Sequence, residues 1–284
     1  MSTRLETRGT YVVESIVGEY DRLVRIAHAF DDDVRDGWRR TGLGGGARVI
    51  DVGCGALGAL QSFANLVGPT GCVVGLDFNA GALANAETIL TQRGSSNFQL
   101  VHGDINTIAL DEIPGAGSFD LVYCRLFLIH QRDPVATLRR MSELVRPGGR
   151  LLVQEMVFGN IAERSLSDPP LPARARWQRL LWSAMQHVGA SPSIATRLGA
   201  VCVGAGLQDL GQRAFFCMSG PRHAPESIQL EIKTLLSVEK AIVDSGAATA
   251  DEVQALIAEY EAARAWTFDY WTGHLCNELV AAVP

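Results

Sequence analysis

The chain has 284 residues and a formal net charge of −6, from 25 Lys and Arg residues against 31 Asp and Glu residues. Hydrophobic residues make up 47% of it and charged residues 20%, a globular composition that excludes a largely disordered chain. The acidic balance argues against nucleic acid as the partner, because phosphate contacts need a basic face. We find no apolar run of about 18 residues and no apolar leader, so we expect no membrane partner and a cytoplasmic location.

The six cysteines are scattered along the chain, and none forms a C-x-x-C pair. They are Cys54, Cys72, Cys124, Cys202, Cys217 and Cys276. Most of them lie in apolar stretches, which predicts reduced, buried thiols in an intracellular protein. Since no spacing of Cys and His residues suits a metal ion, we expect no metal site.

The predicted secondary structure changes at residue 47 from a helical N-terminal region to alternating strands and helices. Apolar residues at helical spacing predict a helix over 11–30, and a glycine-rich stretch at 42–46 ends this N-terminal region. Buried strands then alternate with helices. We predict strands over 48–52, 72–77, 97–102, 119–124 and 150–157, and helices over 59–67, 79–92 and 134–145. Asn79 and Asp133 suit the N-cap positions of the last two helices.

This alternation is typical of βαβ units and predicts a doubly wound, Rossmann-like α/β sheet whose ligand binds beyond the C-terminal strand ends. Beyond residue 158 we predict helices through Trp177 and Leu181, over 193–204, and over 225–264 with a break near 245–246. Strands over 207–218 and within 265–283 bring the sheet to seven strands. The expected parts are an N-terminal helical lid segment (1–44), a Rossmann-like cofactor-binding core (45–158), cap helices (159–206), and C-terminal strands with inserted helices 225–264 (207–284).

Three signals follow consecutive predicted strands. Gly53, Gly55 and Gly58 match G-x-G-x-x-G between a strand and a helix, where glycines allow a tight turn and close approach of a ligand. Asp77 ends the next strand and can accept both hydroxyls of a ribose. Asp104 after the third strand, beside an aliphatic residue, suits an adenine. Each acid alone is more often a cap or turn residue, but together on one rim they indicate an adenosine-containing cofactor.

The stretch 45–158 contains a series of motifs in a characteristic order. They are Asp51-Val-Gly-Cys-Gly, Gly75-Leu-Asp77, Gly103-Asp104-Ile105, Phe119-Asp-Leu-Val-Tyr-Cys124 and Leu144-Val-Arg-Pro-Gly-Gly149. This series resembles that of the class I S-adenosylmethionine-dependent methyltransferases. The group with this compact sheet and cap mostly methylates small molecules. The resemblance therefore implies S-adenosyl-L-methionine as cofactor, S-adenosyl-L-homocysteine as its product, and a small-molecule substrate.

The resemblance also implies a cofactor site, made by Asp51, Gly53, Cys54, Gly55, Asp77, Phe78, Asp104, Ile105, Cys124, Arg125 and, from the N-terminal region, Tyr11. In it the glycines line the methionine portion, Asp51 orients their loop, and Asp77 holds the ribose. Asp104 and Ile105 hold the adenine with Phe78 beside it. Cys124 and Arg125 approach the amino-acid end through backbone groups. The third glycine stands at Gly58 where the commoner motif has it at position 57, so we expect a locally shifted loop.

Methyl transfer needs alignment and exclusion of water, and it needs a general base only where the acceptor loses a proton. His130, after the fourth strand, is the first candidate base and Glu155, late in the fifth, is the second. A structural role is the alternative for both. Trp177, Trp182 and Trp271 are candidates for an apolar substrate pocket, with packing against the sheet as the alternative. We interpret His187 and His274 as structural.

The sequence therefore predicts methyl transfer from S-adenosylmethionine to a small apolar or aromatic acceptor of secondary-metabolite type, with O- or C-methylation favoured. One alternative is an NAD(P)-dependent oxidoreductase, which shares the glycine loop, although the chain lacks a Tyr-x-x-x-Lys pair. The other is a fold that binds the same cofactor but serves a non-methyl reaction. We expect a monomer or a homodimer.

Overall fold

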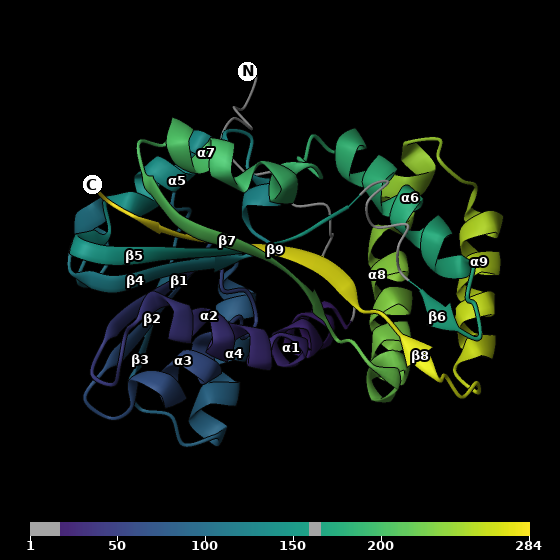
Figure 1. Ribbon diagram of the computed structural model, residues 1–284, viewed down its shortest axis with the longest axis horizontal. Helices are drawn as coiled ribbons and strands as arrows, with labels where there is room; N and C mark the ends of the chain where they lie inside the picture. The colour runs from purple at the N-terminus through teal and green to yellow at the C-terminus, as the bar shows by residue number, and fades with distance from the viewer. Residues whose placement is uncertain (1–17, 159–165) are drawn as a thin grey trace.

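The computed structural model describes residues 18–158 and 166–284. Its centre is a seven-stranded sheet in the order β3-β2-β1-β4-β5-β9-β7 (Figure 1). The strands are β1 (Arg48–Val52), β2 (Cys72–Asp77), β3 (Phe98–His102), β4 (Phe119–Arg125), β5 (Val145–Met156), β7 (Gln208–Cys217) and β9 (His274–Ala282). The first five are parallel, and β9 runs antiparallel to both of its neighbours. The expected doubly wound sheet of seven strands is confirmed.

Helices cover both faces of this sheet (Figure 1). On one face lie α1 (Glu19–Ala29), α2 (Asp31–Thr41), α3 (Leu60–Val67) and α4 (Ala80–Gln92), and on the other lie α5 (Pro134–Ser142) and α7 (Leu198–Gly204). Because both faces are covered, the central strands are mostly apolar, and Val49, Ile50 and Val52 of β1 are all buried. The two expected caps form, since the side chain of Asn79 accepts the N–H of Ala82 and that of Asp133 accepts the N–H of Ala136.

A third group of helices stands beyond one end of the sheet (Figure 1). It consists of α6 (Ala173–His187), α8 (Ala224–Asp244) and α9 (Ala250–Ala263), with a two-stranded ribbon of β6 (Ser167–Asp168) and β8 (Tyr270–Trp271) beside it. Short 3-10 turns lie at Leu110–Glu112, Leu128–His130, Ile194–Arg197 and Pro221–His223. Helix α8 contacts α6, α9 and α1. We expected cap helices throughout 159–206, but α7 packs against α5 and β7, so of this range α6 is the helix in the cap.

Helix α2 is absent from the sequence-based expectation. Its sequence is mostly charged, and only Val34, Gly37, Trp38 and Thr41 are buried. It docks because the Trp38 ring packs on Phe63 at 6.0 Å and because Arg40 pairs at 3.0 Å with Glu278, which is buried in β9. These partners are distant in sequence, so the local pattern gives no sign of them.

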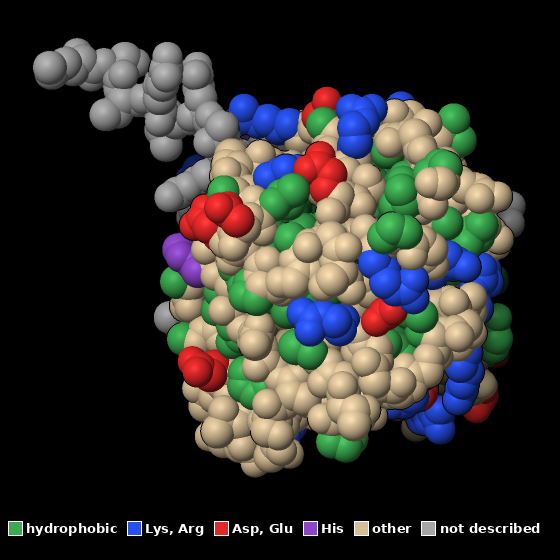
Figure 2. Space-filling model, turned by 90° about the vertical axis from the view of Figure 1, so that its left-hand side faces the viewer, with side chains coloured by type: hydrophobic (Ala, Val, Ile, Leu, Met, Phe, Trp, Pro, Cys, Tyr) green, Lys and Arg blue, Asp and Glu red, His purple; other side chains and the backbone are tan. Residues whose placement is uncertain are grey.

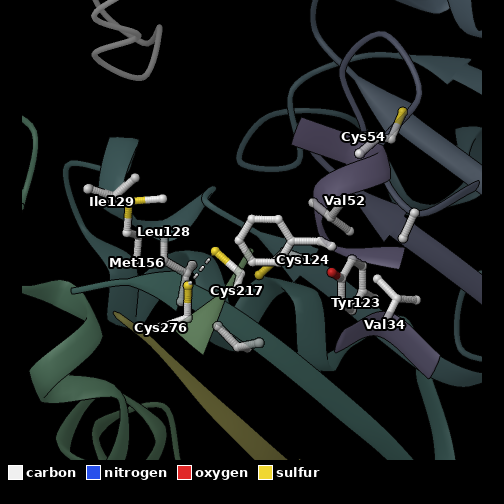
Figure 3. Packing of buried hydrophobic residues seen from close by; sticks show 14 of the residues in the cluster. Val34, Val52, Cys54, Tyr123, Cys124, Leu128, Ile129, Met156, Cys217 and Cys276 are labelled. Atoms are coloured by element: carbon white, nitrogen blue, oxygen red, sulfur yellow. Dashed lines mark hydrogen bonds between the residues drawn. The ribbon is translucent and has the colours of Figure 1, made fainter. Parts of the chain in front are cut away.

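The cysteines are free, and all but Cys72 are buried, as expected. Cys217 and Cys276 face each other across β7 and β9 with their sulfur atoms 3.8 Å apart (Figure 3). No described helix is long and apolar enough to cross a membrane. On the face opposite α6, α8 and α9, basic side chains lie among acidic and hydrophobic ones (Figure 2).

Candidate functional site

A cavity of about 1000 Å³ lies at the C-terminal ends of the parallel strands, where a doubly wound sheet binds its ligands. One part is polar and is lined by the segments that follow β1, β2, β3 and β4. Its lining includes Asp51, Gly53, Cys54, Gly55, Asp77, Phe78, Asp104, Ile105 and Arg125. The other part is apolar and lies toward α6 and α8. Its lining includes Ile129, Met156, Phe158, Trp177, Leu181, Met185, Met218, Leu230 and Val238.

The glycine loop after β1 depends on missing side chains. Gly53 has a φ of 74°, and a Cβ there would collide with the ring of Phe127. Gly58 has a φ of 53°, and a Cβ there would collide with the Asp51 carboxylate. That carboxylate accepts the N–H of Ala59 at 2.7 Å. The glycine at position 58 therefore leaves room for the Asp51 carboxylate, which is compatible with the expectation that Asp51 orients the loop.

Asp77 ends β2, and both of its carboxylate oxygens hold backbone amides. Oδ2 accepts the N–H of Gly55 at 2.7 Å, and Oδ1 accepts the N–H of Asn79 at 2.8 Å. Burial raises the pKa of Asp77, and these amides act in the opposite direction. Each carboxylate oxygen offers two acceptor positions, so the group retains capacity for two ligand hydroxyls. The arrangement is compatible with the expected ribose contact.

Phe78, Asp104 and Ile105 lie on the rim beside Asp77. Phe78 is 47% exposed, although it lines the cavity. Ile105 is buried, and the Oδ1 atom of Asp104 accepts the backbone N–H and the side-chain N–H of Asn106 at 2.9 and 3.0 Å. A partly exposed aromatic side chain, an aliphatic side chain and a carboxylate thus line the same part of the cavity.

Arg125 ends β4 and brings a buried cation to the cavity. Its guanidinium lies over the ring of Phe30, 4.7 Å from the ring centre. Among the residues that the structure describes, its buried Nη1 atom has no hydrogen-bond partner. The charge of Arg125 also acts to lower the pKa of the buried Asp51, and it can attract an anionic group of a ligand in the cavity. We expected Arg125 to act through its backbone, whereas the structure brings its side chain into the site. Cys124 is buried outside the cavity lining (Figure 3).

Glu155 lies beneath the segment that follows β4. Its Oε1 atom accepts the N–H groups of Phe127 and Leu128 at 2.9 and 2.7 Å. Burial raises its pKa to about 8, against these amide bonds. The side chain is buried and is not in the cavity lining, so it differs from our expectation of a group directed at substrate. It holds the backbone that carries Phe127 onto the glycine loop, a positioning role.

Two of the other candidates line the cavity, and two do not. His130 lines it from the turn Leu128–His130, and Trp177 lines it from α6. Trp182 is half-buried outside the lining. Trp271 is also outside it, and the Arg174 guanidinium lies over its ring, 3.9 Å from the ring centre. Tyr11 lies outside the described residues.

One group of the cavity wall is missing from the sequence-based site. His274, at the start of β9, lines the cavity, and behind it lie Glu231 of α8 and Arg174 of α6. No spacing connects residues 174, 231 and 274, since only the fold brings β9 against α8. The one available signal was a histidine in an otherwise apolar C-terminal stretch. In the described part of the chain no cluster of three potential metal ligands occurs.

The fold and the rim of glycines and carboxylates define a doubly wound α/β domain built for a nucleotide-like ligand. Residues 43–189 match the family model described as a methyltransferase domain. The match covers more than half of the chain, which therefore belongs to this methyltransferase family. Family and fold confirm the resemblance to the class I S-adenosylmethionine-dependent methyltransferases, and they argue against the oxidoreductase alternative.

Named relatives share the core of the chain. The aklanonic acid methyltransferase of a Streptomyces species is 37% identical over 115 residues, which are 40% of this chain and 50% of that protein. The demethylmenaquinone methyltransferase of a Geobacillus species is 30% identical over 153 residues, 53% of this chain and 63% of that protein. The chain thus spans less than two thirds of the length of these relatives.

Solved structures share the fold over most of the chain. Coclaurine N-methyltransferase, solved with N-methylheliamine and S-adenosylhomocysteine, superposes with a TM-score of 0.55 at 14% identity, over 90% of this chain and 72% of that one. The [4+2]-cyclase SpnF superposes with a TM-score of 0.54 at 19% identity, over 89% of this chain and 81% of that one. At these identities the likeness extends to the fold alone.

Proposed function

We propose that the protein transfers the methyl group of S-adenosylmethionine to a small apolar or aromatic acceptor of secondary-metabolite type, at oxygen or carbon. The observation that supports this most directly is the division of one cavity into two parts. A polar part with three aspartates, the glycine loop and Arg125 adjoins an apolar part lined by Trp177 and the side chains of α6 and α8. A charged cofactor and an apolar acceptor would meet where these parts join.

The polar part fits the cofactor. Asp77 would bind the ribose hydroxyls, and Asp104, Ile105 and Phe78 would surround the adenine. The guanidinium of Arg125, a residue of the cavity lining, would bind the carboxylate of the methionine portion. When bound, the cofactor supplies a methyl group on a sulfonium, which is already electrophilic.

The apolar part fits the acceptor. Its aliphatic, methionine and tryptophan side chains exclude water and offer flat and adaptable contacts to a ring. The relatives act, by their names, on aklanonic acid and demethylmenaquinone, which supports an organic acceptor of moderate size. The chain's own contribution to the reaction is alignment of the acceptor and exclusion of water.

Of the expected lid segment 1–44, we propose that α1 is the lid, because its Leu23 and Ile26 line the cavity, whereas α2 is docked on the sheet by Trp38 and Arg40. Free, buried cysteines support a reducing, cytoplasmic location. We propose a monomer or a homodimer, which light scattering would distinguish.

The test is transfer of an isotopically labelled methyl group from S-adenosylmethionine to a panel of naphthols, hydroxyquinones and β-dicarbonyl compounds. We expect at least one labelled product, whose mass and NMR spectrum identify oxygen or carbon as the acceptor atom. Tight binding of S-adenosylhomocysteine without transfer to a broad panel would favour the non-methyl alternative, which is relevant because the cyclase SpnF shares the fold.

A further inference from the structure

Helix α1 lies over the polar part of the cavity, between the helices of the sheet and α8 (Figure 1). Tyr20, Leu23 and Ile26 of α1 line the cavity. A Cβ at Gly55 in the glycine loop would lie 3.5 Å from the Cδ1 atom of Leu23. A Cβ at Gly81, near the start of α4, would collide with the hydroxyl of Tyr20. The helix therefore covers a ligand that is bound at the glycine loop.

Helix α8 forms the wall beside α1 and carries two neighbouring rows of side chains. One row lines the cavity at helical spacing and consists of Leu230, Thr234 and Val238. The next row bonds to side chains of α1 and consists of Glu226, Lys233 and Ser237. Since one helix carries both rows, its contact with α1 lies directly beside the apolar part of the cavity.

The contact between α1 and α8 is a row of alternating charges. The Nη1 atom of Arg25 is 2.8 Å from the Oε1 atom of Glu226, and its Nε atom is 3.0 Å from the Oδ2 atom of Asp21. The Nζ atom of Lys233 is 3.0 Å from the same oxygen of Asp21. The bonds from Lys233 and Arg25 lower the pKa of Asp21, so its carboxylate is charged at neutral pH. We call Glu226, Arg25, Asp21 and Lys233 the α1–α8 latch.

The two ends of α1 are held in different ways. At its C-terminal end the helix passes into α2 through Phe30, whose ring packs on that of Phe215 with the ring centres 6.4 Å apart. Toward its N-terminal end it is joined to α8 by the latch, whose side chains are between 26% and 49% exposed. Exposed ion pairs are weak and are screened by salt, so they break and form again easily. This construction gives α1 a fixed end at Phe30 and a releasable end at α8.

We propose that the α1–α8 latch controls access to the cavity, so that ligands enter and leave when its ion pairs break and α1 moves away from α8. This rests on the proposed function and adds the regulation of its site. While the latch is closed, α1 and α8 exclude water from the place where cofactor and acceptor meet. When it opens, both products can leave. Because the latch is ionic, the cavity opens more often as the ionic strength rises.

The test measures opening of the cavity by the rate at which iodoacetamide alkylates single cysteines, which mass spectrometry resolves. Cys217 lines the cavity but is only 1% exposed, so its thiol reacts when the cavity opens. Lys233→Glu places a second carboxylate beside Asp21, and we expect it to accelerate this alkylation about tenfold. Asp21→Lys in the same chain restores opposite charges across the two helices and should return the rate toward the wild-type value. In the wild type, salt at about 1 M should also accelerate the reaction.

Two controls separate the latch from general effects of charge and stability. Arg176→Glu makes the same change of charge in the ion pair that Arg176 forms with Glu259 between α6 and α9, outside the cavity lining. It should leave the alkylation rate of Cys217 unchanged. Cys202 of α7 is buried outside the cavity lining and reports unfolding of the whole protein, so its rate should be the same in every variant.

Two outcomes overturn the latch. One is a wild-type alkylation rate of Cys217 in a folded Lys233→Glu variant. The other is acceleration of Cys202 by the same factor as Cys217, which would make the ion pairs a part of the general stability of the fold. Both are measured on protein without cofactor. Failure of the wild type to bind S-adenosylhomocysteine in a calorimetric titration would instead overturn the proposed function, so the two failures are distinguishable.

Discussion

The Asp51 carboxylate lies in the space that a side chain at Gly58 would occupy. A Cβ atom at position 58 would collide with the Oδ2 atom of Asp51 and with the backbone of Cys54, and the φ of Gly58 is 53°. In this place Oδ2 accepts the N–H of Ala59, just before α3 begins. The two residues thus set the course of the glycine loop from the end of β1 into α3.

Gly58→Ala should therefore damage both the fold and the cofactor site. We expect a loss of about 3 kcal/mol in the free energy of unfolding, from backbone strain and from a displaced buried carboxylate. Gly246→Ala is the matched control, since Gly246 also has a positive φ but open space around it, and it should cost about 1 kcal/mol. Urea unfolding measures both values. Equal losses in the two variants would contradict the role of Asp51.

Asp77→Asn should weaken the binding of S-adenosylhomocysteine about 10- to 100-fold. The change preserves shape but replaces a charged acceptor, which accepts the N–H groups of Gly55 and Asn79, with an amide that has one acceptor oxygen. Calorimetric titration measures the affinity. Asp111→Asn, at an exposed turn outside the cavity, is the control and should bind like the wild type. Unchanged affinity of Asp77→Asn would remove the ribose assignment.

Arg125→Met should weaken binding of the amino-acid end of the cofactor and leave binding of its adenosine end unchanged. We expect affinity for S-adenosylhomocysteine to fall about tenfold or more, because the carboxylate loses its cation. Affinity for adenosine, which has no carboxylate, should stay close to that of the wild type. The free energy of unfolding should not fall much, since the guanidinium leaves a buried nitrogen unpaired in the described structure. Equal losses of affinity for both ligands would place Arg125 elsewhere in the site.

Glu155 should make the protein less stable as pH rises. Its pKa is raised by burial from 4.5 to about 8, so the folded state holds the proton more tightly than the unfolded state does. This stability is complete below pH 4.5 and is lost as pH rises to about 8, by at most about 1.4 kcal/mol per pH unit. Asp51 and Asp33, whose pKa values are raised to about 6, also make the protein less stable as pH rises, but their contributions are lost by about pH 6.

Urea unfolding at pH 6.5 and pH 8 isolates the contribution of Glu155. We expect Glu155→Gln to show a smaller loss of stability over this interval than the wild type, because the amide oxygen can accept the N–H groups of Phe127 and Leu128 without a charge. Glu87→Gln on the exposed side of α4 should keep the wild-type slope. An unchanged slope in Glu155→Gln would mean that Glu155 is ionised in the folded protein.

The fold could be predicted largely from the sequence because its strands are buried on both faces and its helices have local signals. The runs that became β1, β2 and β4 are apolar, and the caps Asn79 and Asp133 stand where their helices begin. Helix α2 was missed because its buried stripe is short, with Val34 and Trp38 as its large apolar side chains, and because Phe63 and Glu278, which hold it, are distant in sequence.

The site could be predicted only where it follows strand ends. Asp51 lies near the end of β1, Asp77 ends β2 and Asp104 follows β3, so their place on one rim follows from topology. The direction of a side chain does not follow from topology. Because β5 is buried on both faces, its sequence has no alternation of polar and apolar residues that would predict where Glu155 points. His274 was interpreted as structural, because nothing in the sequence shows that its cluster assembles residues from α6, α8 and β9 beside the cavity.

The most direct test of the account is a calorimetric titration of the wild-type protein with S-adenosylhomocysteine, with NADH and NADPH as controls. The account predicts micromolar binding of S-adenosylhomocysteine and none of either nicotinamide cofactor. Binding of NADH or NADPH with no binding of S-adenosylhomocysteine would contradict the central claim.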